Sequence, residues 1–182
     1  MVRPAHGAQG RGLSAGDVTV QEIGYTQQAA LATKKVDAIV GFVNSEPIQL
    51  AAAGISAKVI DLGTVPLVSI CLVTTSAFAT AHPDVVRAVV KGTVAGMQSV
   101  VSNQDAAFQA STAYVPGLSD AATAKGAKAV LAATAPLFQN GDGTVTGTMD
   151  ATAWDAMSSA MVGAGLLKAA QTSSSAMTNA YV

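Results

Sequence analysis

The chain has 182 residues, enough for one or two small domains with a buried core, and a formal net charge of -1. Half of the residues are hydrophobic and 12% are charged, a low charged share that comes with Ala-rich stretches and favours helices. This balance gives no electrostatic reason to expect nucleic acid as a partner; no apolar run is long enough for direct membrane insertion, and the single cysteine, Cys71, excludes an intrachain disulfide.

The first third of the chain alternates predicted strands and helices. Residues 1–16 are Gly-rich and basic, have no apolar central region typical of a signal peptide, and are predicted to be a disordered tail. Alternating side chains at 17–23 predict a strand, the continuous apolar run at 36–42 predicts a buried strand, and residues 57–62 are predicted as a third.

Two helices are predicted between these strands. Thr26 is a plausible N-cap for a helix over residues 27–34, and Pro47 lies in the first turn of a second helix that ends at Gly54. The order strand, helix, strand, helix, strand predicts an α/β fold, with a parallel βαβαβ unit in residues 17–64.

Beyond residue 64 the chain is predicted to be mainly helical. Residues 65–75 form a long β-rich segment that is expected to cross between two domains. Apolar residues at three- and four-residue spacing then predict a long helix, and Ser119 is the expected N-cap of a later one. Residues 76–81 are predicted to be a short helical turn, and the predicted helices cover residues 83–104, 105–114, 119–137 and 152–167. Residues 171–182 are predicted to be a disordered tail.

The run from residue 24 to residue 62 resembles the middle of the substrate-binding proteins of ABC importers. The branch is the one that contains the NMT1/THI5-like pyrimidine-precursor proteins and the sulfonate, taurine and nitrate binders. The landmarks, quoted in chain order, are Gly24-Tyr25, Lys35-Val36-Asp37-Ala38, Phe42-x-Asn44-x-Glu46-Pro47, Val73-Thr74-Thr75, His82-Pro83-Asp84-Val85-Val86-Arg87, Met149-Asp150, Trp154 and Gly163-x-Gly165-Leu166-Leu167.

The resemblance implies a periplasmic-binding-protein type II fold, in which two lobes close on a solute. Residues 17–64 would belong to the second lobe, and residues 65–170 would hold the crossing strand and the helical part of the first lobe, giving a partial clamshell. Family members work in the periplasm, or tethered outside the membrane, and deliver a small polar solute to an ABC transporter permease. We therefore expect a solute-binding receptor that lacks the N-terminal part of the family's sequence.

Two other functions stay open at this point. One is a truncated remnant that binds no solute, because half of the expected cleft would be missing. The other is an enzyme, since eukaryotic pyrimidine synthases of the same superfamily resemble pyridoxal phosphate enzymes with a Cys-rich motif. That motif is absent from this sequence. No catalytic residue, metal site or cofactor is predicted.

Five residues are candidates for contact with the solute. Phe42 could stack on a flat ring, Asn44 could donate and accept hydrogen bonds, and Glu46 could pair with ring amino groups. These groups suit a polar heteroaromatic solute better than a sulfonate, for which helix N-termini and arginine are expected. The alternative is that Asn44 and Glu46 only cap the helix that begins there.

The remaining two candidates lie directly before the first predicted helix. Tyr25 either points into the cleft or lies on its rim, and Thr26 either donates to an anionic group of the solute or simply caps the helix. The two histidines, His6 and His82, are isolated from acid and cysteine partners and predict neither a catalytic triad nor a metal site.

Overall fold

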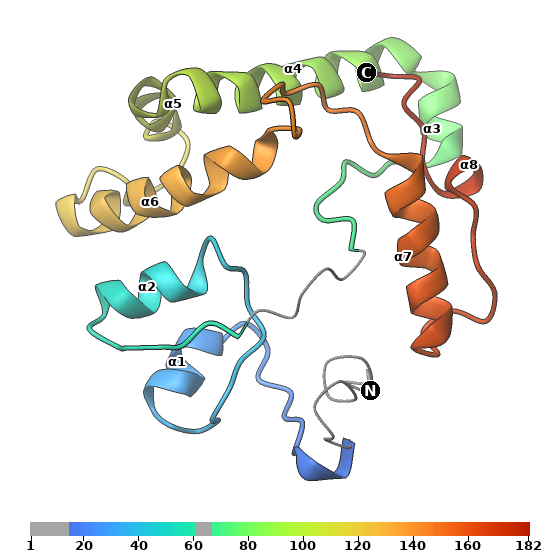
Figure 1. Ribbon diagram of the computed structural model, residues 1–182. Helices are drawn as coiled ribbons and strands as arrows, with labels where there is room; N and C mark the ends of the chain where they lie inside the picture. Colours follow the sequence, from blue (N-terminus) through green and yellow to red (C-terminus); the bar gives the residue numbers. More distant parts are fainter. Residues whose placement is uncertain (1–14, 61–66) are drawn as a thin grey trace. The chain divides into compact units, whose positions relative to one another are not determined.

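The computed structural model describes residues 15–60 and 67–182, and its regular elements are helices (Figure 1). Within these two ranges no segment forms a strand. The chain divides into two compact units. The first draws on Met1–Val20, Asp61–Val90 and Gly147–Val182, and the second consists of Gln21–Ile60 and Lys91–Thr146. Each unit is described separately below.

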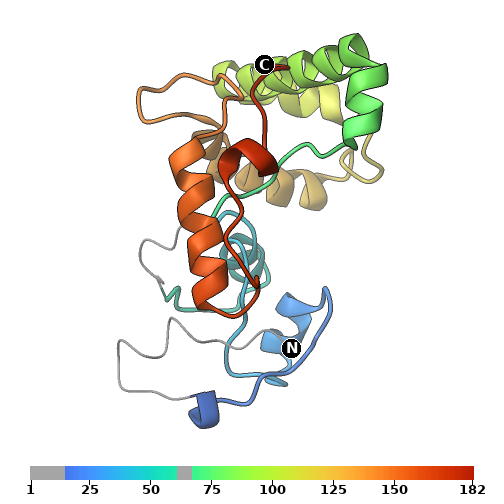
Figure 2. The ribbon, with the colours of Figure 1, turned by 90° about the vertical axis from the view of Figure 1, so that its right-hand side faces the viewer.

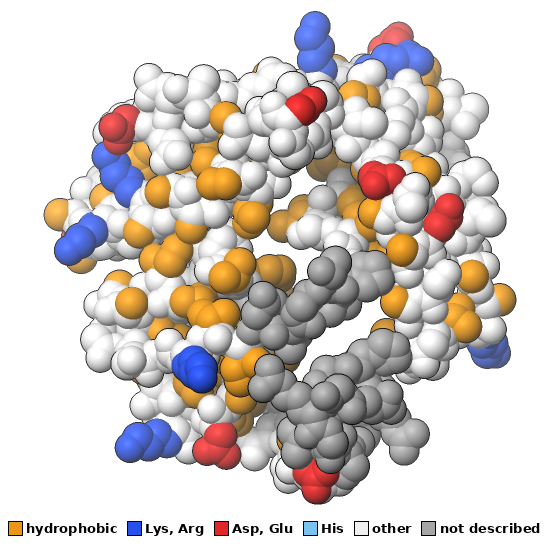
Figure 3. All heavy atoms as spheres, in the orientation of Figure 1, with side chains coloured by type: hydrophobic (Ala, Val, Ile, Leu, Met, Phe, Trp, Pro, Cys, Tyr) orange, Lys and Arg blue, Asp and Glu red, His pale blue; other side chains and the backbone are white. Residues whose placement is uncertain are grey.

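The second unit is a set of helices that pack one against the next. Helix α1 (Gln27–Ala32) contacts α2 (Glu46–Ala52), α2 contacts α6 (Ala121–Thr134), and α6 contacts α5 (Gln104–Ser111) and the 3-10 helix η3 (Ala135–Phe138). On the face shown in Figure 3, hydrophobic side chains gather where α2 and α6 meet. The buried apolar residues of this unit are Ala30, Leu50, Phe108, Ala135 and Val145.

The first unit contains α3 (Ser76–Ala81), the start of the long helix α4 (Pro83–Ser102), α7 (Ala151–Gly163) and the short α8 (Ser173–Ala176). A 3-10 helix, η2 (Ala15–Asp17), precedes them in the chain. Figures 1 and 2 both show the chain after α7 doubling back beside that helix. Among the helices of the described ranges, none combines the length and hydropathy needed to cross a membrane.

Four helices begin directly after a residue whose side chain caps the first turn. Thr75, Asn103, Asp120 and Asp150 accept hydrogen bonds from backbone N–H groups in the first turns of α3, α5, α6 and α7, respectively. The predicted cap of α6, Ser119, is therefore wrong by one residue, because the carboxylate of Asp120 accepts from the Thr123 N–H at 2.9 Å.

The predicted strands are not formed in the part of the chain that the structure describes. Asp17 lies in η2, and residues 18–23 and 36–42, together with 57–60 and 67–75, are non-helical and form no strand. The rest of the segments predicted at 57–62 and 65–75 lies outside the described residues. Several of their apolar side chains, among them Val40, Ile70 and Val73, are exposed. An apolar pattern marks a segment suited to a pleated surface, but a strand forms only where a neighbour completes its ladder. The α/β prediction is therefore not met by this largely helical structure.

The structure describes only one of the two predicted tails in full. Of residues 1–16, positions 1–14 lie outside the described residues. Residues 171–182, in contrast, contain α8 and bond to the rest of the first unit. The Ser158 hydroxyl and the Asp155 carboxylate each accept a backbone N–H of this segment at 2.6 Å, and the Asn179 amide pairs with both backbone polar groups of Met149.

We expect acid to destabilise the protein, because two aspartates of the second unit have lowered pKa values in the folded state. A hydrogen bond and charge attraction from Lys128, at 2.7 Å, lower the pKa of Asp105, and hydrogen bonds from Thr123 lower the pKa of Asp120. Because each pKa is lower in the folded state, the unfolded state binds protons more readily. The stabilisation is complete above the ordinary pKa of 3.8 and is lost as the pH falls through the lowered values. We expect the melting temperature to fall between about pH 4 and about pH 2, and less steeply in Asp120→Asn, which keeps a capping oxygen. Equal slopes would contradict this.

Candidate functional site

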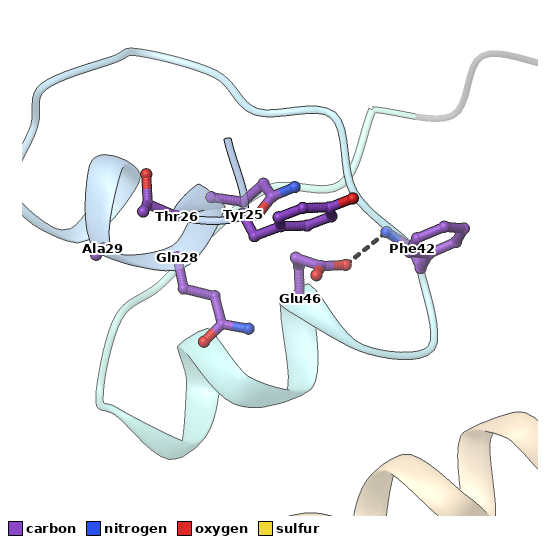
Figure 4. Close-up of a pocket in the computed structure, with 7 residues that line it drawn as sticks. Tyr25, Thr26, Gln28, Ala29, Phe42 and Glu46 are labelled. Atoms are coloured by element: carbon purple, nitrogen blue, oxygen red, sulfur yellow. Dashed lines mark hydrogen bonds between the residues drawn. The ribbon is translucent and has the colours of Figure 1, made fainter. Parts of the chain in front are cut away.

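A pocket of about 460 Å³ lies in the second unit, between the start of α1 and the start of α2 (Figure 4). Seven residues line it: Tyr25, Thr26, Gln27, Gln28, Ala29, Phe42 and Glu46. The structure thus brings four of the five predicted site residues to one hollow, and leaves out Asn44. Their contact with a solute stays a prediction.

The side chain of Glu46 closes a tight loop over residues 42–46. The carbonyl of Phe42 accepts the N–H groups of Ser45 and Glu46 at 2.9 and 3.1 Å, which turns the chain into α2. In the opposite direction, the Phe42 N–H donates to Oε2 of Glu46 at 2.5 Å (Figure 4). Glu46 is therefore held in place by its own loop and lines the pocket. It does not cap α2, because the N–H group that it accepts belongs to Phe42, before the helix, and no side chain caps the start of α2.

Gly41 makes room for this arrangement. A Cβ atom at position 41 would lie 2.8 Å from both Cγ and Oε2 of Glu46. Side chains essentially never approach so closely, so the glycine is required by the position of the Glu46 side chain rather than by its own backbone.

The two aromatic side chains of the pocket are exposed. Tyr25 follows Gly24, which has the positive φ of 57° that suits glycine, and Figure 4 shows the Tyr25 ring beside the Glu46 carboxylate. Tyr25 is fully exposed and Phe42 is 66% exposed. Exposed rings beside a hollow offer apolar area that a flat ligand can cover.

Thr26 occupies the N-cap position of α1, as predicted, but its hydroxyl does not cap the helix. The hydroxyl donates instead to the Ile23 carbonyl at 2.6 Å. Because its proton is engaged there, Thr26 is not arranged to donate to an anionic ligand group, although the residue lines the pocket.

Asn44 faces a different part of the second unit. Its side-chain amide donates to the hydroxyl of Thr134 on α6 at 2.8 Å, and that hydroxyl donates in turn to the Val130 carbonyl at 2.7 Å. This geometry makes Asn44 a link between the loop before α2 and helix α6.

The structure adds Gln28 to the pocket, a residue that sequence reasoning missed. Its amide nitrogen donates to the carbonyl oxygen of Gln49 on α2 at 2.7 Å, and the Gln49 amide donates to the Ser45 hydroxyl at 2.9 Å. The signal available in the sequence was the position of Gln28 in the first turn after Tyr25 and Thr26.

Charge within the pocket is negative. Glu46 supplies a carboxylate, and neither lysine nor arginine occurs among the seven lining residues. A carboxylate without a balancing cation disfavours anions such as sulfonates or nitrate and suits neutral rings that carry N–H groups. The described residues also hold no cluster of histidine, cysteine, aspartate or glutamate side chains that could bind a metal ion.

Comparison with known proteins gives a family match that includes the pocket. The family described as "NMT1/THI5 like" matches residues 6–107, more than half of the chain. The chain belongs to this family. All residues that line the pocket of this NMT1/THI5-like chain lie inside the matched range. The resemblance seen in the sequence is thereby confirmed.

A curated relative of this NMT1/THI5-like chain carries a ligand in its name. The riboflavin-binding protein RibY of Chloroflexus aurantiacus is 33% identical over 177 residues, which cover 94% of this chain and 49% of the relative. The chain thus spans about half the length of the curated relative that it matches. No solved structure matches.

Proposed function

We propose that the chain is part of the solute-binding receptor of an ABC importer and that the pocket between α1 and α2 binds a flat, polar heteroaromatic solute. In this proposal the receptor works in the periplasm or tethered outside the membrane and passes its solute to a permease. The observation that carries the proposal is that Tyr25, Phe42 and Glu46 line one pocket.

The chemistry of these residues selects among the solutes of the wider family. The Tyr25 and Phe42 rings can cover the faces or edges of an aromatic solute, and carboxylate and amide groups can bond its polar edge. A flavin or a pyrimidine offers both features, whereas taurine and nitrate have no ring. The name of the curated relative supports a flavin in particular.

An enzyme is a weaker candidate. The seven lining residues include no lysine, which a pyridoxal phosphate enzyme requires for its Schiff base, and no cysteine, histidine or serine that could serve as a nucleophile with a base. The curated relative is also named as a binding protein.

Titration with riboflavin tests the proposal directly. Stacking on tyrosine quenches flavin fluorescence, so binding would be seen as a saturable loss of emission, and the melting temperature would rise by mass action. At a riboflavin concentration of 100 times Kd, the free energy of unfolding would increase by about 2.7 kcal/mol. Taurine and nitrate are the matched negative ligands.

The remnant hypothesis makes the opposite prediction. If riboflavin and a panel of pyrimidines left both emission and melting temperature unchanged, the chain alone would not act as a receptor. A melting temperature raised by taurine or nitrate but not by a flat ring would overturn the assignment of the solute class.

A further inference from the structure

Gln28 differs from the other polar residues of the pocket because two partners in series fix its side chain. Its amide nitrogen donates to Oε1 of Gln49 at 2.7 Å, and Gln49 uses its own amide nitrogen to donate to the Ser45 hydroxyl at 2.9 Å. Since the Ser45 hydroxyl accepts from Gln49, the Gln49 amide presents its oxygen, not its nitrogen, to Gln28.

This relay sets the orientation of the Gln28 amide. With one N–H bound to Gln49, the side chain keeps its carbonyl oxygen and a second N–H for other partners. Among the residues that the structure describes, no group donates to this carbonyl oxygen. Gln28 lines the pocket from α1, while Gln49 and Ser45 belong to α2 and its N-cap, so the relay also joins the two helices that form the pocket.

We propose that Gln28 determines specificity in the pocket: its oriented amide accepts a hydrogen bond from a ring N–H of the solute, and Gln49 and Ser45 act as positioning residues. This inference rests on the proposed solute-binding function and adds a residue to it. The group recognised is an N–H flanked by carbonyls, as in the imide edge of a flavin or a pyrimidinedione.

The relay matters because it fixes the side chain before the solute binds. A free glutamine loses rotamer entropy when it is immobilised by a ligand, and its amide can turn to satisfy either a donor or an acceptor. An amide already held by Gln49 loses less entropy when the solute binds. If the Gln28 amide turned over, so that its N–H and carbonyl groups changed places, its bond to Gln49 would break. The arrangement therefore discriminates between ring edges rather than simply adding affinity.

Gln109 provides a matched control outside the pocket. It lies on α5 in the same unit, it is exposed, and among the described residues its side chain makes no hydrogen bond. Gln109→Leu makes the same change of side chain as Gln28→Leu and leaves both the pocket and the relay intact.

The test compares riboflavin with its N3-methyl derivative, which lacks the imide N–H. Fluorescence titration of the unaltered chain is expected to give a Kd for riboflavin about tenfold lower than for the methyl derivative, the effect of about one hydrogen bond. In Gln28→Leu this ratio should fall to about one, and in Gln49→Leu to an intermediate value. In Gln109→Leu it should stay at about ten. Circular dichroism and melting temperature confirm that each variant is folded.

Two failures can be told apart. If riboflavin binds but Gln28→Leu keeps the full ratio, or the unaltered chain binds both flavins equally, the role of Gln28 is overturned and the receptor function stands. If the unaltered chain binds neither flavin and none of the pyrimidines, the proposed function fails, and the inference about Gln28 fails with it.

Discussion

Replacing Gly41 with alanine is expected to weaken riboflavin binding about tenfold and to lower the free energy of unfolding by about 1–3 kcal/mol, the usual cost of overpacking. The new methyl group would lie 2.8 Å from Cγ and Oε2 of Glu46. The Cγ atom of Glu46 lies near the backbone of α2, so it cannot rotate away as the end of a long side chain can. The carboxylate would have to leave the Phe42 N–H, which it accepts at 2.5 Å, and so leave its place on the pocket wall.

A double-mutant cycle with Glu46→Ala isolates this cause. Once the Glu46 side chain is shortened, a methyl group at position 41 no longer meets it, so Gly41→Ala should have little further effect on binding or stability in the Glu46→Ala background. Additive losses would show that the glycine acts through something other than Glu46. Gly92→Ala is the matched control: a Cβ there meets nothing within 4 Å, in the middle of α4. It should raise the free energy of unfolding by about 0.5–1 kcal/mol.

Leu50→Ala is expected to be the most destabilising of the substitutions considered, at about 2–5 kcal/mol of unfolding free energy. Leu50 is 3% exposed on α2, the helix that contacts both α1 and α6. Its loss leaves a cavity at the centre of these contacts. Because α1 and α2 carry the two sides of the pocket, riboflavin binding should weaken as well.

Chemical denaturation measures this effect, with Leu137→Ala as the control. Leu137 lies in η3 of the same unit but is 61% exposed, so the same truncation there should change the free energy of unfolding by less than about 0.5 kcal/mol. Equal costs for the two leucines would mean that Leu50 is not part of a packed core.

Helices were the part of the fold that the sequence could predict. The short helical turn predicted at 76–81 coincides with α3, and the three- and four-residue spacing beyond Pro83 predicted α4. Caps were less certain, since Ser119 and Asp120 are both good N-cap residues and only the hydrogen bond to Thr123 decides between them. The predicted strands do not form in the described residues, because strand formation depends on partner segments that the local pattern does not reveal.

The pocket was predictable in part for a related reason. Tyr25 and Glu46 each lie at a predicted helix start, and the packing of α1 on α2 brings those starts together without any sheet. The role of Asn44 could not be read from the sequence, because its partner Thr134 is 90 residues away. Gln28 was missed because its importance depends on Gln49, 21 residues further along the chain.

The bonded state of residues 171–182 bears on how this protein should be prepared for crystallisation. The string TSSSAMTNAYV has the composition that is usually trimmed to obtain better crystals. Here such trimming would remove Asn179 from Met149, and it would remove the Tyr181 ring that lies 5.6 Å from the Arg87 guanidinium. A chain shortened at residue 170 would expose the side of α7 and be harder to crystallise. Replacing flexible surface side chains elsewhere would keep the contacts of residues 171–182.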